Sequence, residues 1–148
     1  MKIRLFPIDQ SGKIIEGQLP QTFATVDVCK MTVEHYKKSG FEAPWVSYLV
    51  CDEEKWIGTC AFKSAPKDNR VEIAYYTFPE FEGLGIATQM ATRLVKLARN
   101  TKPGVVVFAQ TLPSENSSTG ILTKMGFKNI GSKMHPEDGE VWEWELAR

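Results

Sequence analysis

The sequence has no excess of charge of either sign. Its 18 Lys and Arg residues balance 18 Asp and Glu residues, so the formal net charge is zero. A nucleic-acid-binding protein is expected to carry a basic excess, so this balance predicts that nucleic acid is not a partner. No apolar run approaches the roughly 20 residues that a membrane-spanning helix needs. Charged residues interrupt the first six positions, and we therefore expect neither a signal peptide nor a membrane partner.

Cysteine is scarce as well. Cys29, Cys51 and Cys60 are an odd number at wide spacing, without a C-x-x-C pair. This pattern argues against a disulfide framework and against a zinc site. We therefore predict no metal site and a reducing, cytoplasmic location.

What the sequence does contain is typical of one globular domain. The 148 residues are 43% hydrophobic and 24% charged, which predicts a single domain over residues 1–148 with a sizeable core. In the first half, residue patterns and turn signals predict a helix and four strands, the last three forming an antiparallel meander. The expected ranges are a strand at 2–8, a loop at 10–20, a helix at 22–38 ended by Gly40, and strands at 45–51, 56–62 and 71–78.

The second half predicts one parallel crossover. Residues 85–100 show a 3.6-residue apolar period, and the continuously apolar run 105–109 is typical of a strand buried on both faces. A short helix is expected at 114–125, and two final strands flank a turn at 136–139. The predicted fold class is therefore α+β, with a mixed, mostly antiparallel twisted sheet and one strand–helix–strand crossover.

The glycine pair before the long helix is the most informative motif. Gly83 and Gly85 let the backbone approach a ligand closely, and free N–H groups at the helix start form an anion site. The alternative is a turn that only connects two elements. A dinucleotide fingerprint is excluded, because Thr88 stands where Gly or Ala is needed and no acidic residue lies between Glu82 and Glu115. Residues 126–133 nearly match a P-loop but lead into a strand instead of opening a helix.

Taken together, these motifs resemble the GNAT acetyltransferase superfamily, closest to its ribosomal-protein and small-molecule N-acetyltransferase branch. The resemblance rests on residues 71–88 and 112–127 at the expected separation. It implies the GNAT-like acyl-CoA N-acyltransferase fold, and acetyl-CoA as a co-substrate whose acetyl group passes to a primary amine in a ternary complex. That amine belongs to a small molecule or a protein N-terminus, and the enzyme is expected to be a monomer or homodimer. Two alternatives stay open: a non-catalytic acyl-CoA-binding module and a peptide-binding domain without a CoA site.

The resemblance also assigns the donor site. It implies that the pantetheine arm pairs with the backbone of Tyr76, Thr77 and Phe78, and that Asn116 belongs to the second cofactor motif. The pyrophosphate is expected on the backbone N–H groups of Gly83, Leu84, Gly85, Ile86, Ala87 and Thr88. The sequence departs from the family pattern at Glu80, which replaces Gln or Arg, at Glu82 beside the expected phosphates, and at Leu122, which replaces a tyrosine acid.

Glu72 is the candidate general base, because a carboxylate between Val71 and Ile73, on a strand that leads to the glycine motif, is expected to be partly buried with a raised pKa. The alternative is an exposed strand glutamate without a catalytic role. Ser118 is the candidate acid; it and Thr119 are alternatively helix-capping residues.

The remaining side chains carry less information. His35 and His135 are expected at the surface, and Trp142 and Trp144 are expected in the core, with an alternative role in lining the acceptor site. The acceptor site itself is expected between region 9–40 and the turn at 135–139. The acids of that turn indicate either a cationic acceptor or a solvated loop.

Overall fold

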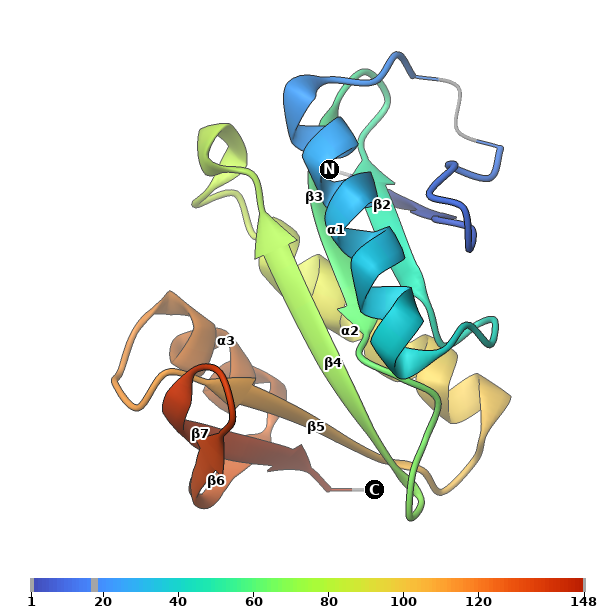
Figure 1. Cartoon of the computed structure of the whole chain (residues 1–148). Helices are drawn as coiled ribbons and strands as arrows, with labels where there is room; N and C mark the ends of the chain where they lie inside the picture. The colour runs from blue at the N-terminus through green and yellow to red at the C-terminus, as the bar shows by residue number, and fades with distance from the viewer. Residues whose placement is uncertain (1, 17–18, 148) are drawn as a thin grey trace.

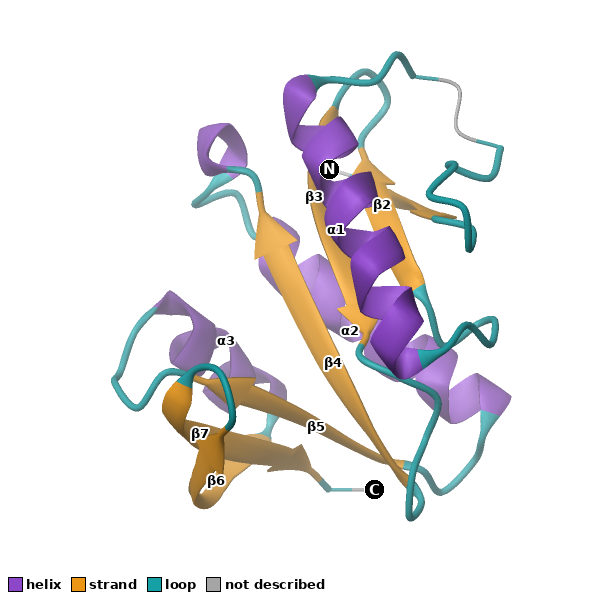
Figure 2. Ribbon diagram, viewed as in Figure 1, coloured by secondary structure: helices purple, strands orange, loops and turns teal. Residues whose placement is uncertain are grey.

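The computed structural model describes residues 2–16 and 19–147. Over these residues the chain forms seven strands, three α-helices and one 3₁₀ turn, and the strands make a single mixed sheet (Figures 1 and 2). The strand order is β1-β2-β3-β4-β5-β7-β6, which confirms the predicted α+β class. The elements are β1 (Arg4–Pro7), α1 (Phe23–Ser39), β2 (Ser47–Cys51), β3 (Trp56–Phe62), β4 (Arg70–Thr77), η1 (Pro79–Phe81), α2 (Ile86–Thr101), β5 (Val106–Thr111), α3 (Ser117–Met125), β6 (Phe127–His135) and β7 (Gly139–Leu146).

A tight turn sets the register between β3 and β4. Asp68 and Asn69 have φ angles of 52° and 59°, and the flanking Lys67 and Arg70 exchange two backbone hydrogen bonds of 2.9 Å. Two consecutive residues with positive φ are typical of a type I′ turn, whose twist matches that of the flanking strands. The turn completes the predicted antiparallel meander of β2 to β4, and β1 pairs antiparallel with β2 at its edge.

The two large helices cover opposite faces of the sheet (Figure 1). The predicted apolar stripe of α2 is confirmed, because Ile86, Met90 and Leu94 are almost fully buried in the main core. On the other face, α1 buries Cys29 and Tyr36 together with two threonines. Most of the apolar residues that suggested this helix are outside the core; the side chain of Phe23, for example, is 95% exposed.

The strands β4 and β5 are paired at one end and apart at the other (Figure 1). Their parallel register covers Arg70 to Glu72 against Val106 to Phe108. Asn69 fastens the closed end, because its side chain donates a 3.0 Å hydrogen bond to the carbonyl of Gly104. Beyond Glu72 the two strands diverge, and β5 instead continues its antiparallel pairing with β7.

Two burial predictions need correction. The strand β5 is not buried on both faces: Val107 and Ala109 are buried, but Phe108 is half-buried, and the Arg70 guanidinium lies 4.2 Å from its ring centre. Trp144 is a core residue as predicted, whereas Trp142 is half-buried. Phe108 is half-buried because α2 and α3 lie behind the sheet and the other face of β5 has no helix over it (Figure 2). None of the described helices is long and apolar enough to cross a bilayer.

Candidate functional site

The open end of the β4–β5 pair exposes backbone groups of β4. The backbone groups of Glu72 and Phe78 point toward β3, because Glu72 accepts from Lys63 N–H at 2.9 Å and Phe78 donates to the Ile57 carbonyl at 2.9 Å. Alternate residues of a strand direct their backbone groups to opposite sides. The N–H and C=O groups of Tyr75 and Thr77 therefore face the gap, and an extended chain with amides could pair with them.

This parity refines the predicted donor segment. Of the three residues assigned to it, Thr77 turns its backbone toward the gap, whereas the N–H of Phe78 is already bonded within the sheet. The side chain of Tyr76 is 53% exposed and that of Phe78 is buried, and their rings meet edge to face. Thr77 has a further distinction: its Oγ1 is buried and lacks a hydrogen-bond partner among the described residues.

The N-terminus of α2 is built differently from those of the other two helices. In α1, the side chains and backbones of Thr22 and Thr25 bond reciprocally, and Asn116 and Thr119 do the same in α3. Such capping boxes satisfy N–H groups that have no partner inside the helix. The cap residue of α2 is Gly85, and no side chain caps this helix. Its first N–H groups are consequently free to bind an anion, with the positive end of the helix dipole behind them.

Both glycines of the predicted cradle adopt backbone conformations that favour glycine. The φ angles are 80° at Gly83 and 78° at Gly85, in the left-handed region. A Cβ added at either position has no atom within 4 Å. The space in front of the α2 N-terminus is therefore open. Of the flanking residues, Leu84 is 54% exposed, and Glu80 and Glu82 are exposed as well.

A groove of about 1300 Å³ lies on the face of the sheet that α1 covers, between α1, the strands β4 and β5 and the β6–β7 turn. Its lining includes Glu72, Ile73 and Ala74 from β4 and Gln110, Thr111 and Leu112 from β5. The α1 helix and the turn at 135–138 supply the walls, as the sequence predicted for an acceptor site. Neither Asn116 nor Ser118 lines this groove. The Oδ1 of Asn116 accepts from Thr119 N–H as a helix cap, and Ser118 is half-buried in the first turn of α3.

Glu72 lies at the floor of the groove. Burial raises the pKa of its carboxyl group, Glu143 raises it further, and the nearby Lys63 and His135 oppose this rise. The Glu72 carboxylate makes no hydrogen bond or ion pair with another described residue. A half-buried, unpaired carboxylate with a raised pKa is suited to accept a proton from a ligand. The predicted burial and pKa shift of Glu72 are confirmed; its catalytic role stays a prediction.

Both histidines are half-buried and line this surface groove, so the predicted surface positions are confirmed. The Nε2 atom of His35 lies 2.7 Å from the carbonyl oxygen of Lys63 and must carry a proton to donate to it. The Nδ1 atom of His135 accepts the backbone N–H groups of Glu137 and Asp138 at 3.1 Å each. Each histidine is partly covered because it binds backbone groups, which single-sequence reasoning does not reveal.

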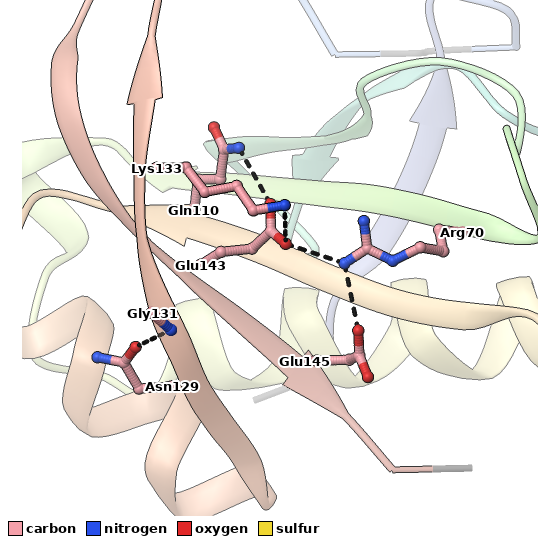
Figure 3. A network of polar contacts seen from close by, with 7 residues as sticks. All are labelled: Arg70, Gln110, Asn129, Gly131, Lys133, Glu143 and Glu145. Atoms are coloured by element: carbon pink, nitrogen blue, oxygen red, sulfur yellow. Dashed lines mark hydrogen bonds and ion pairs between the residues drawn. The ribbon is translucent and has the colours of Figure 1, made fainter.

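A buried ionic network fastens the strands next to the groove (Figure 3). The carboxylate of Glu143, 3% exposed, accepts from Arg70 at 3.0 Å and lies 3.2 Å from Lys133 Nζ. Gln110 donates to it at 3.4 Å, and Arg70 also reaches Glu145 at 3.2 Å. Burial alone raises the pKa of Glu143, but these hydrogen bonds outweigh it and hold the pKa below its usual range. Sequence reasoning missed this network; its only signal was the alternation of acids and tryptophans in β7.

Comparison with known proteins identifies relatives of this fold. A family model described as an acetyltransferase (GNAT) domain matches residues 14–128. Among solved structures, a chimera of the spermidine N-acetyltransferase SpeG from Vibrio cholerae has a TM-score of 0.70 at 14% identity, with 99% of this chain and 95% of that chain covered. The ribosomal-protein alpha-N-acetyltransferase RimL has a TM-score of 0.69 at 14% identity, with 97% and 91% covered. The self-immunity acetyltransferase MccE, in complex with acetyl-CoA and AMP, has a TM-score of 0.65 at 15% identity, with 84% and 71% covered. A search of curated protein sequences found no match.

Proposed function

The chain belongs to the acetyltransferase (GNAT) domain family, and from this premise we propose that it is an N-acetyltransferase that takes acetyl-CoA as donor and a primary amine as acceptor. One observation carries the proposal: the gap between β4 and β5 opens beside the uncapped N-terminus of α2. An extended chain with amides that ends in a pyrophosphate matches both features. Acetyl-CoA has that composition, and the similar protein MccE was solved in complex with acetyl-CoA.

The donor is proposed to bind through the backbone. The free N–H groups of residues 86–88 at the start of α2 receive the pyrophosphate, and the positive φ of Gly83 and Gly85 allows the close approach. The pantetheine amides pair with Tyr75 and Thr77 across the gap. The buried, unpaired Oγ1 of Thr77 gives this arm a hydrogen-bonding group that the protein alone leaves unsatisfied.

Glu72 is proposed as the proton acceptor. An acceptor ammonium loses its proton to this carboxylate, directly or through water, and the free amine attacks the thioester carbonyl. The new bond is C–N, the bond that breaks is C–S, and CoA leaves as the thiol after taking up a proton. We propose that the carbonyl oxygen accepts from a β4 backbone N–H that faces the gap, because such preorganised donors supply much of the rate enhancement. Ser118 stays the candidate for protonating the leaving sulfur.

Acceptor and donor are proposed to meet at the gap between β4 and β5. The groove that contains Glu72 lies on the α1 face, and the gap between β4 and β5 begins directly after Glu72. An amine at the groove floor is therefore placed next to a thioester lying in the gap. The fit of both ligands to one opening supports direct transfer in a ternary complex.

A non-catalytic acyl-CoA-binding module is the second candidate function. It is favoured by the departures at Glu80 and Glu82, which are exposed next to the cradle. Binding cannot separate the two functions, because both use the same donor site. Turnover separates them, since only the enzyme releases free thiol from acetyl-CoA in the presence of an amine.

The test combines both readouts on the wild-type chain. CoA at 100-fold over its dissociation constant should stabilise the fold by about 2.7 kcal/mol, which raises the melting temperature by several degrees. Thiol release is then measured with acetyl-CoA and a panel of amino acids, peptides, polyamines and aminoglycosides. Binding with turnover supports the enzyme, binding without turnover across the panel supports the module, and no thermal shift with millimolar CoA overturns both.

A further inference from the structure

The groove around Glu72 holds more unpaired positive charge than unpaired negative charge. Four lysines and four acids line it, so the totals are equal. Two of the acids already have partners: Glu137 lies 3.8 Å from Lys38 Nζ, and Glu34 lies 2.9 Å from Lys37 Nζ. The other lining lysines, which make no ion pair with any described residue, are Lys30, Lys63 and Lys67. The lining acids without a lysine partner among the described residues are Glu72 on the floor and Asp138 in the turn.

One of these lysines lies directly beside the candidate base. Phe62 pairs with Ile73 across β3 and β4, so the next residues, Lys63 and Glu72, are cross-strand neighbours on one face. Their backbones are joined by a 2.9 Å hydrogen bond. Side chains at such positions start about 5 Å apart at their Cβ atoms. A ligand whose amine reaches Glu72 therefore has its adjoining atoms within reach of the Lys63 ammonium.

The other free lysines extend this charge along the groove. Lys67 precedes the tight β3–β4 turn on one side, and Lys30 projects from α1 on the other. Both are exposed. A polycationic acceptor would bring additional ammonium groups against these lysines, and like charges in one groove repel. The acids of the β6–β7 turn offset this only in part, since Glu137 pairs with Lys38, Glu140 does not line the groove, and Asp138 alone remains.

We propose that the acceptor is a primary amine that carries an anionic group on the same molecule, and that Lys63 and Lys67 bind this group while Glu72 receives the amine. This inference rests on the proposed function and names its substrate class. Two sources share the chemistry: an acidic amino acid and a peptide with an acidic N-terminal segment. The groove volume of about 1300 Å³ accommodates either one.

The experiment compares matched acceptors with saturating acetyl-CoA. The first pair consists of two peptides that begin with serine, one continuing with Glu-Asp and the other with Lys-Lys. The second pair is L-aspartate and its diamide, in which uncharged amides replace both carboxylates. Spermidine is the polycation. Thiol release gives kcat/KM, and calorimetry in the presence of CoA gives binding without turnover. Each exposed lysine–anion pair contributes up to about fivefold. We therefore expect the acidic member of each pair to be favoured by about tenfold, and the better pair identifies the source.

Charge reversal at the lysines provides the decisive variants. Lys63→Glu combined with Lys67→Glu should remove the preference for acidic acceptors and favour the Lys-Lys peptide, with CoA affinity unchanged. Lys96→Glu is the matched control, because Lys96 is exposed on α2 behind the sheet and should leave the preference as in the wild type. Equal rates within each pair, a preference for spermidine, or acidic acceptors that neither react nor bind would overturn the proposal. If the wild type does not bind CoA at all, that result would instead overturn the proposed function itself.

Discussion

The two sides of the open sheet are made from different chemical groups. The proposed donor side uses one continuous stretch, residues 75–88, and offers mainly backbone N–H and C=O groups. The proposed acceptor side is a groove of side chains drawn from α1, the β3–β4 hairpin, β4, β5 and the β6–β7 turn. The first surface depends on backbone conformation, and the second depends on which side chains distant segments bring together.

This difference determines how substitutions should act. A backbone site tolerates most side-chain changes and fails where a glycine is replaced, since only the conformation and the open space are essential. A side-chain site changes its ligand when a single charge changes, while the fold stays intact. Donor affinity and acceptor turnover should therefore respond to separate sets of variants.

The largest effect is expected at Glu72. Glu72→Gln keeps the shape of the side chain but removes its ability to accept a proton, which typically costs about 10²–10⁴-fold in rate. The affinity for CoA should not change, because Glu72 lines the acceptor groove. Steady-state thiol release and CoA calorimetry measure the two quantities. A rate within about threefold of wild type would assign the base elsewhere, and lost CoA affinity would make Glu72 a structural residue.

The same variant has a second, independent consequence for stability. Because burial raises the pKa of Glu72 in the fold, ionising it opposes folding, and the wild type loses stability as pH rises through the folded-state pKa. Glu72→Gln should therefore melt at a higher temperature than wild type at pH 7 to 8, with the advantage disappearing below pH about 4. A variant that is less stable than wild type at pH 8 would contradict this assignment.

Gly85→Glu should produce the next largest effect, on the donor side alone. The new side chain and charge enter the open space before α2 and should abolish the stabilisation of about 2.7 kcal/mol expected at 100-fold excess CoA. Gly104→Glu is the matched control, because Gly104 also has a positive φ of 85° and open space around it, but lies beyond the far end of α2. Equal CoA responses from the two folded variants would place the cradle elsewhere.

Glu143→Gln tests the network next to the groove. Losing the charge weakens its hydrogen bonds with Arg70 and Lys133, and we expect a loss of about 2 kcal/mol in urea unfolding at pH 7. Because the folded-state pKa of Glu143 is lowered, its contribution is present above the unfolded-state value and is lost as pH falls through the folded-state value. The difference between the proteins should shrink by pH 3. Glu137→Gln, in an exposed pair, should change stability by less than about 0.5 kcal/mol.

The smallest effect is expected at Thr77. Thr77→Val removes a buried hydroxyl group that has no hydrogen-bond partner in the part of the chain that the structure describes, so the free protein should lose no stability. If the hydroxyl bonds the donor, CoA affinity should fall by about fivefold. Thr77→Ser retains the hydroxyl and should keep most of the affinity. Unchanged affinity in Thr77→Val would limit the donor contact of this residue to its backbone.

The sequence was informative where structure follows from local patterns. The stripe of α2, the hairpin turns and the glycine pair are local features, so the fold and the open, glycine-led start of α2 could be predicted from them. For α1, the apolar residues did not mark the buried face: Phe23 and Met31 are exposed, whereas Thr25 and Cys29 are buried. In this helix the packing of the β1–β3 face outweighs residue hydrophobicity.

The acceptor side could not be predicted in detail, because its contacts join residues far apart in the chain. His35 binds the Lys63 carbonyl across 28 positions, and Arg70 meets Glu143 across 73. Glu72 was the exception, since its position in a strand leading to the glycine motif is a local signal. For Asn116, the family resemblance implied a role at the cofactor; its Oδ1 caps α3, and the cofactor role stays a prediction.

The most direct test of this account is amide chemical-shift mapping of the ¹⁵N-labelled chain during titration with CoA. The account predicts that the largest changes occur at Tyr75, Thr77 and residues 85–88, the backbone groups of the gap and of the uncapped α2 N-terminus. The capped start of α1 should change little. Binding that shifts the α1 N-terminus or the groove walls more strongly than these residues, or no shift at all, would contradict a donor site made of β4 and α2 backbone.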